Sequence, residues 1–391
     1  MTLLSNYWLT WLAPDGLTFN IVIISIFIII ILTILIIKKS SNQNLPPGPR
    51  GLPLVGNLLS LDPDLHTYFA ALARAHGPIY KLRLGTKLGV VVTSPDLARE
   101  VLKVHDATFA NRDVPVAGKE ASYGGADIVW TPYGPEWRML RKVCVREMLS
   151  GATLDSVYAL RRRELRQTIA HLYVAAKNAA AVDVGEQMFL TVLNVITSML
   201  WGGTVEGEER AGLGAEFKQV VGEMTELLGA PNFSDFFPVV ERLDLQGIQR
   251  RMRGLAKRFD GIFESMIDRR LKMSGGSKDF LQILLQMKDA SGDGDATPFT
   301  ISHVKALLMV TILINPIFKR NLRTPSFATT RVAMAERMFM YSLASLLHSF
   351  DWSVPDGHKL DLEEKFGIVL KKKHPLVAMA TPRLSHPSLY E

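Results

Sequence analysis

An uncharged apolar run at residues 19–37 most constrains how this chain can fold, because its only polar residues are Asn20, Ser25 and Thr33. At 1.5 Å per residue, a helix of this length spans about 28 Å, close to the hydrocarbon thickness of a bilayer. A secretory signal peptide has a basic region before a shorter apolar stretch and a cleavage site of small residues after it, and neither occurs here. The run therefore predicts one transmembrane helix. The alternative, a buried core helix, fits poorly with so many β-branched isoleucines so near the N-terminus.

The residues after this run set its orientation. Lys38 and Lys39 follow it directly and Arg50 comes later, and the positive-inside rule places such residues in the cytosol. We therefore expect residues 1–18 to lie across the membrane and the bulk of the chain to be cytosolic. Residues 38–56 form a basic, proline-rich hinge, because the prolines of Leu-Pro-Pro-Gly-Pro-Arg-Gly-Leu-Pro at 45–53 prevent a helix.

Composition excludes several classes of site. The chain has 391 residues and one cysteine, Cys144, so it forms no internal disulfide and no cysteine-based zinc site. Its nine histidines include no close metal-binding pair, and we expect no metal site built from the side chains alone. The net charge of +7 is moderate for this length and argues against a nucleic-acid partner.

The soluble part is expected to be mainly α with a small β region near its start. Apolar residues at three- and four-residue spacing predict helices at 65–76, 160–179, 187–201, 213–228, 246–272 and 279–288. Residues 79–84 and 89–93 predict a β-hairpin, and Ser94-Pro95 begins a helix that continues to about Val104. Residues 110–135 are rich in Gly, Pro and Asp, which indicates a long loop with a binding role.

Three features in this order carry a resemblance to a known family. They are the apolar run, the proline-rich hinge, and Pro-Tyr-Gly-Pro-Glu-Trp-Arg-Met-Leu-Arg-Lys at 132–142. Together they resemble the microsomal cytochrome P450 monooxygenases, specifically the plant A-type group that includes flavonoid and terpenoid hydroxylases. The resemblance implies a cytochrome P450-like fold for residues 57–309. It resumes over 332–391, whose first helix is expected to continue to about residue 350 and whose terminal strands are expected at 366–376.

The resemblance also implies a cofactor, partners and a location. Trp137 and Arg141 lie one helical turn apart, so an indole N–H and a guanidinium can meet one anionic group; in the family they contact a haem propionate. Residues 111–127 would line the substrate pocket. The implied partners are NADPH–cytochrome P450 reductase and a small apolar substrate, and the implied location is the endoplasmic reticulum membrane.

Residues 310–331 form an atypical junction that lacks the family's catalytic parts. The haem-thiolate ligand occupies the position that is Thr329 here, and a hydroxyl cannot replace a thiolate that donates electrons to iron. The oxygen-activating motif is replaced by a sequence that contains Pro316, which is expected to break or kink its helix. The family's Glu-x-x-Arg pair is absent. Cys144 lies on the propionate-side helix, where we expect a small buried apolar residue.

The sequence thus predicts an internally truncated cytochrome P450-like fold and leaves two functions open. By family, the chain is a haem-dependent monooxygenase that hydroxylates a small apolar plant metabolite with O₂ and reductase-supplied electrons. Without the thiolate loop, we expect no catalytic residue and no activity from the chain as written. The alternative is a non-catalytic, membrane-tethered relative, or a product of aberrant splicing or of an incorrect gene model.

Overall fold

The fold is described from a computed structural model of the chain. It describes residues 16–39, 45–148, 150, 153, 155, 157–202, 208–273, 279–292, 297–317, 328–357, 360–368 and 370–391. Two units of structure, residues 1–97 and 98–391, are described separately.

The first unit contains a hairpin next to a short helix. Helix α3 (Leu65–His76) ends at Gly77, whose φ of 97° suits glycine. Strands β1 (Ile79–Leu84) and β2 (Lys87–Val92) pair antiparallel. The hydroxyl of Tyr80 donates to the carbonyl oxygen of Phe69 at 2.9 Å, which joins the hairpin to α3. The predicted helix and hairpin are confirmed, with β2 beginning two residues earlier than expected.

Helix α2 (Gly16–Lys39) includes the run predicted to be a membrane anchor. The apolar side chains of residues 21–32 are exposed, by between 43% and 64%. Among the residues that the structure describes, no helix is both long enough and apolar enough to cross a membrane. The membrane-spanning role of residues 19–37 stays a prediction.

The predicted helix after Ser94 is confirmed, and it has two parts. Helix α4 (Pro95–Arg99) continues as a π-helical turn, η3 (Glu100–Val104). The Ser94 hydroxyl accepts a hydrogen bond from the Leu97 amide at 3.3 Å, as expected of a residue that begins a helix.

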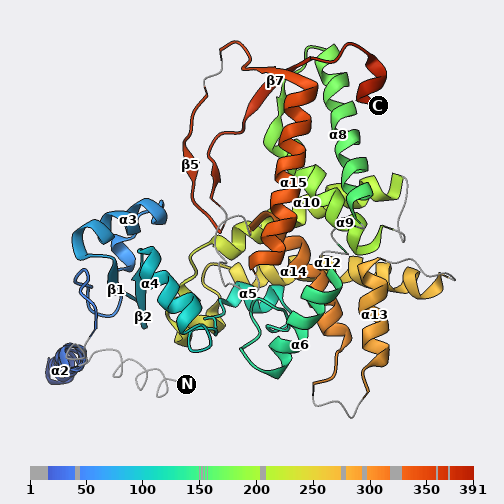
Figure 1. Cartoon of the computed structure of the whole chain (residues 1–391). Helices are drawn as coiled ribbons and strands as arrows, with labels where there is room; N and C mark the ends of the chain where they lie inside the picture. The colour runs from blue at the N-terminus through green and yellow to red at the C-terminus, as the bar shows by residue number, and fades with distance from the viewer. Residues whose placement is uncertain are drawn as a thin grey trace, which may run out of the picture. The chain divides into compact units, whose positions relative to one another are not determined.

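The second unit is mainly helical, and the predicted long helices are present (Figure 1). Two of them begin at aspartates that cap them: the carboxylates of Asp183 and Asp279 each accept a backbone N–H at 3.0 Å. The described helices are α5 (Val116–Ala121), α6 (Pro135–Val143), α8 (Tyr158–Lys177), α9 (Val184–Trp201), α10 (Glu208–Gly229), α11 (Phe233–Phe236), α12 (Ile248–Lys272), α13 (Phe280–Ala290), α14 (Ile301–Ile317) and α15 (Ala328–Ser349).

Helix α14 lies at the centre of the main hydrophobic core. It contacts α9, α10, α12 and α13, and the side chains of residues 306–313 are all buried. Leu307, Leu308 and Ile312 are fully buried in this cluster. The helix continues one residue past Pro316, and its neighbours at 318–327 lie outside the described residues.

The sequence prediction of one long loop at 110–135 is wrong in part, because this segment contains α5. The helix is buried through Val116, Ala117, Gly118 and Ala121. Short-range patterns did not show it, since six residues among glycines and prolines carry little periodic signal. Packing against α12 stabilises it instead.

The C-terminal part combines α15 with small sheets. Strands β3 (Val182–Asp183), β7 (Val377–Pro382) and β4 (Phe350–Ser353) form an antiparallel sheet in that order. Strands β5 (Glu364–Lys365) and β6 (Lys371–Lys372) pair separately. Of the strands expected at 366–376, the structure has β6, and the longer strand β7 begins just after that segment. A second, smaller hydrophobic cluster surrounds Phe350 and Tyr390.

Candidate functional site

Helix α6 carries the two side chains that the sequence predicts for haem binding, Trp137 and Arg141. The guanidinium carbon of Arg141 lies 5.2 Å from the centre of the Trp137 ring, in a cation–π arrangement. The indole N–H of Trp137 donates to the carbonyl oxygen of Ile128 at 3.1 Å. The pair is therefore brought together, but the indole N–H is used by the preceding loop and does not point with Arg141 at a shared anion. Contact of the pair with haem stays a prediction.

The loop before α6 is held in place by its own aspartate. The Asp127 carboxylate accepts hydrogen bonds from the backbone N–H groups of Val129 and Trp130, both at 2.8 Å. This turn fixes the position of Ile128, which lies between Asp127 and Val129. It thereby fixes the carbonyl oxygen that accepts the hydrogen bond of the Trp137 indole. The sequence could not show this, because a carbonyl group is present at every position and its direction depends on the turn.

The predicted pocket segment, residues 111–127, is tied to α12. Glu120 accepts two hydrogen bonds from Arg253, at 3.0 and 2.7 Å, and one from Gln249 at 2.9 Å. The hydrogen bond from Arg253 lowers the pKa of Glu120 more than its partial burial raises it. These contacts fix α5 against one face of α12. Whether the segment lines a substrate pocket stays a prediction.

A second group of charges joins the start of α14 to α12. The Lys305 ammonium donates to Asp260 at 2.7 Å and to Glu264 at 2.9 Å. Burial acts to lower the pKa of Lys305, but these two carboxylates outweigh it and raise the pKa. The Tyr123 hydroxyl also donates to Asp260, at 2.9 Å, and burial followed by this hydrogen bond raises the pKa of Tyr123. At neutral pH both donors therefore keep their protons.

A link between α6 and α14 escaped the sequence analysis. His303 Nε2 lies 2.9 Å from the Glu136 carboxylate, and the Thr300 N–H donates to His303 Nδ1 at 3.0 Å. Because Nδ1 accepts, the proton is assigned to Nε2, which donates to Glu136. Thr300 directly precedes α14 and His303 is the third residue of that helix. This is the spacing of a capping box, so the sequence could have indicated the contact between Thr300 and His303. Nothing in the sequence indicated Glu136.

Neither of the two positions considered for a haem-thiolate ligand, Cys144 and Thr329, provides one. Cys144 follows α6 directly and is fully buried in the main hydrophobic cluster, as expected for a small apolar residue. Thr329 is in the first turn of α15; its side chain lies outside the described residues. Among the described residues, no three His, Cys, Asp or Glu side chains are grouped so that they could hold a metal ion.

These residues do not fit a haem-thiolate site. The thiol of Cys144 is enclosed by core side chains, and residues 306–313 of α14 are buried against neighbouring helices. The indole N–H expected for a propionate is bonded to Ile128. We therefore derive no catalytic step through haem for this chain.

The fold and these contacts define a mainly helical protein built around one buried central helix, with an aromatic–arginine pair on a neighbouring helix. A sequence model of the family described as Cytochrome P450 matches residues 46–313, and the match ends within α14. The chain belongs to the cytochrome P450 family.

Individual relatives are plant proteins. The chain is 34% identical over 267 residues to a flavonoid 3'-monooxygenase of Crocosmia x crocosmiiflora, a match that covers 68% of this chain and 52% of that protein. The chain spans about half the length of the first curated relatives that it matches. A zebra fish cytochrome P450 structure with progesterone has the same fold, with a TM-score of 0.63 and 15% identity over 81% of this chain and 99% of that chain.

One longer match shows an internal difference. A geraniol 8-hydroxylase of Swertia mussotii is 28% identical over 467 aligned positions, which cover 87% of this chain and 94% of that protein. Because 87% of 391 residues is about 340, more than about 120 of the 467 positions have no counterpart here. The chain thus matches nearly the whole relative while lacking part of it.

Proposed function

We propose that the polypeptide with this sequence is a non-catalytic member of the cytochrome P450 family. The observation that carries the proposal is the absence of a usable thiolate: the sole cysteine, Cys144, is enclosed in the core, and the family's ligand position is Thr329. A haem-thiolate enzyme needs that sulfur for cleavage of the O–O bond. The packed state of residues 306–313 on α14 supports the same conclusion.

We place the missing segment at residues 310–331. Two findings support this placement: the family match ends at residue 313, and the match to the geraniol 8-hydroxylase leaves more than about 120 of 467 positions empty while covering 87% of this chain. A transcript in which that segment is restored would encode the second candidate function. This is a haem-dependent monooxygenase that hydroxylates a small apolar plant metabolite with electrons from NADPH–cytochrome P450 reductase. The names of these relatives favour flavonoid- and terpenoid-like substrates.

We also propose that α2 tethers the protein to the endoplasmic reticulum membrane, with the larger unit in the cytosol. Support comes from the uncharged run at 19–37 and the lysines after it. The apolar side chains of residues 21–32 are also exposed, and burial in a membrane would remove them from water. Alkaline carbonate extraction of microsomes tests the tether. The full chain should stay in the membrane pellet, and its release into the supernatant would contradict the proposal.

The experiment on activity is a reduced, CO-treated spectrum of microsomes that contain the full chain. We expect no Soret band of thiolate-ligated haem, and a chain carrying the relatives' whole missing segment in place of residues 310–331 serves as the positive control. A thiolate-type band from the chain as written would contradict the proposal. The variant Cys144→Ser would then show whether Cys144 is the source of that band.

Sequencing transcripts across residues 309–332 separates the two candidates at their origin. If every transcript encodes the junction as written, the non-catalytic protein is the gene product. If transcripts carry the additional segment, the monooxygenase is the product and the short chain is a splice form or an error.

A further inference from the structure

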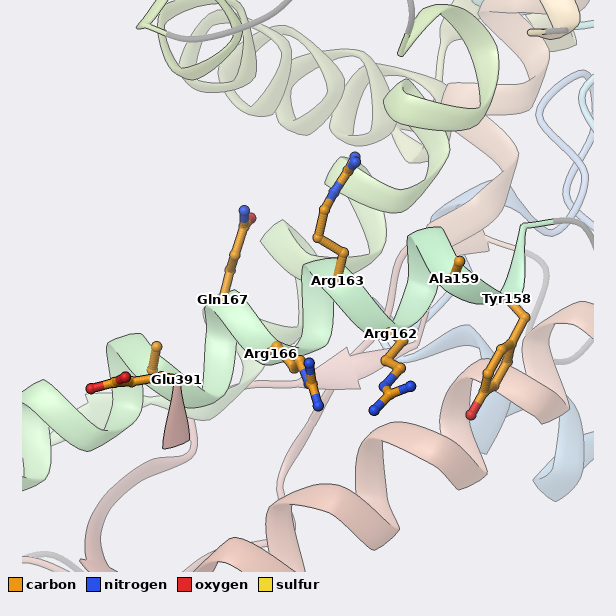
Figure 2. A pocket seen from close by; sticks show the side chains of 8 residues that line it. Tyr158, Ala159, Arg162, Arg163, Arg166, Gln167 and Glu391 are labelled. Atoms are coloured by element: carbon orange, nitrogen blue, oxygen red, sulfur yellow. The ribbon is translucent and has the colours of Figure 1, made fainter. Parts of the chain in front are cut away.

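A groove of about 410 Å³ runs along the exposed side of α8. Figure 2 shows its lining: the side chains of Arg162 and Arg166 extend on one side of the helix, and those of Arg163 and Gln167 on the other. Tyr158 lies at one end of the groove and Glu391 toward the opposite end. Neither the family's chemistry nor the contacts around α6 and α14 involve this groove.

Two of the arginines of the groove carry positive charges that no described carboxylate neutralises. Arg163 pairs with Glu164 at 3.2 Å. Within the part of the chain that the structure describes, Arg162 and Arg166 have no carboxylate within ion-pair distance. They are one helical turn apart, where like charges repel and destabilise a helix. Such an arrangement is stabilised when an anion binds between the two guanidinium groups.

The surroundings strengthen the positive potential. Arg161, next to Arg162, is 4% exposed, and among the described residues its Nη1 has no hydrogen-bond partner. Tyr341 of α15 lies 6.0 Å from Tyr158 between ring centres. Burial raises the pKa of Tyr341, while Arg162 and Arg166 act to lower it.

We propose that Arg162 and Arg166 bind the phosphate group of an organic phosphomonoester. A phosphomonoester carries a charge of about −1.5 to −2 at neutral pH and three acceptor oxygens, which matches two unneutralised guanidinium groups. Guanidinium binds phosphate in a bidentate fork. The groove is larger than a phosphate group needs, so the organic part lies beside the Tyr158 ring. The Glu391 carboxylate repels an anion, so we expect the ligand to extend from the two arginines toward Tyr158 and not toward Glu391.

The test uses the full chain in phosphatidylcholine nanodiscs, titrated with phenyl phosphate and followed by calorimetry and thermal melting. We expect saturable binding that weakens with salt. A hydrogen bond to a charged group contributes strongly to the binding free energy. The double variant Arg162→Gln/Arg166→Gln should therefore bind phenyl phosphate at least about tenfold more weakly. Arg251→Gln, which replaces an exposed arginine on α12, is the matched control and should bind as the unaltered chain does.

Further measurements test whether phosphate is the group recognised and whether the ligand is a lipid or a soluble molecule. Phenyl sulfate, a monoanion of similar shape, should bind more weakly than phenyl phosphate. Arg162→Lys/Arg166→Lys keeps the charge without the fork and should bind with intermediate affinity, which shows that a loss in the glutamine variant is not misfolding. If phosphatidic acid in the nanodiscs competes with phenyl phosphate, the natural ligand is a lipid with a phosphate headgroup. If it does not compete, the natural ligand is a soluble phosphomonoester. Absence of binding, or equal binding by the glutamine variant, would overturn the proposal.

Discussion

Helices α14 and α15 both carry many apolar residues, α14 the larger share, but their surroundings differ. On α14, residues 306–313 are buried from every side. On α15, Phe339, Met340, Leu343 and Leu347 are 49%, 60%, 41% and 52% exposed. The four residues lie on one side of α15: Phe339 and Met340 are adjacent, and every other pair is three, four, seven or eight positions apart. We call them the α15 stripe.

The difference shows that a strong apolar pattern predicts a helix but not the partner that covers it. Helix α14 contacts α9, α10, α12 and α13, whereas the principal described contacts of α15 are with α8 and β4. An apolar helix face normally packs against a neighbour. The partial exposure of the α15 stripe among the described residues is the result expected if a packing segment of the relatives is missing from this chain.

The largest expected effect comes from comparing a buried phenylalanine with an exposed methionine. Phe263 is fully buried and lies 5.6 Å from Phe259 between ring centres. Phe263→Ala should lower the free energy of unfolding by about 3–5 kcal/mol, because it leaves a cavity. Met340→Ala, on the α15 stripe, should lower it by less than about 1 kcal/mol, because that side chain is 60% exposed and little of its surface is buried. Urea unfolding followed by circular dichroism measures both, and equal losses would show that the stripe is covered.

A smaller effect is expected at the junction of α6 and α14. His303→Ala removes the hydrogen bonds to Glu136 and to the Thr300 amide, and should lower the free energy of unfolding by about 1–2 kcal/mol. Glu136→Gln keeps an acceptor for the His303 proton and should cost less. If the two variants are equally destabilised, the charge of Glu136 rather than the hydrogen bond holds the helices together.

Much of the fold could be predicted from the sequence, since the long helices follow directly from apolar spacing. What could not be predicted depends on contacts between distant residues. Glu136 and His303 are separated by 167 positions, and the Trp137 partner depends on how the loop at Ile128 turns. The same limit applies to the site: the sequence placed Trp137 and Arg141 on one helix, but not the carbonyl group that takes the indole N–H.

A pH-dependent effect is expected at Glu120. Its pKa in the folded state is lowered, chiefly by Arg253, so its contribution to stability is present above the ordinary carboxyl pKa and is lost as pH falls through the lowered value. Glu120→Gln should therefore cost about 0.5 kcal/mol at neutral pH, a small amount because solvent screens the pair. The difference from the unaltered chain should disappear in acid. A difference that is constant with pH would show that charge plays no part.

The smallest effect on stability is expected at the α15 stripe itself, where polar substitution tests the comparison directly. Met340→Lys and Leu347→Lys together should change the free energy of unfolding by less than about 0.5 kcal/mol, because side chains exposed in the folded chain lose little burial. Binding of a dye that reports exposed apolar surface should fall, since the stripe is part of that surface. The control, Met287→Lys on α13, replaces a residue that packs against the main core, so it should destabilise the protein and raise dye binding. A large loss of stability in the stripe variant would mean that another surface covers α15 in solution.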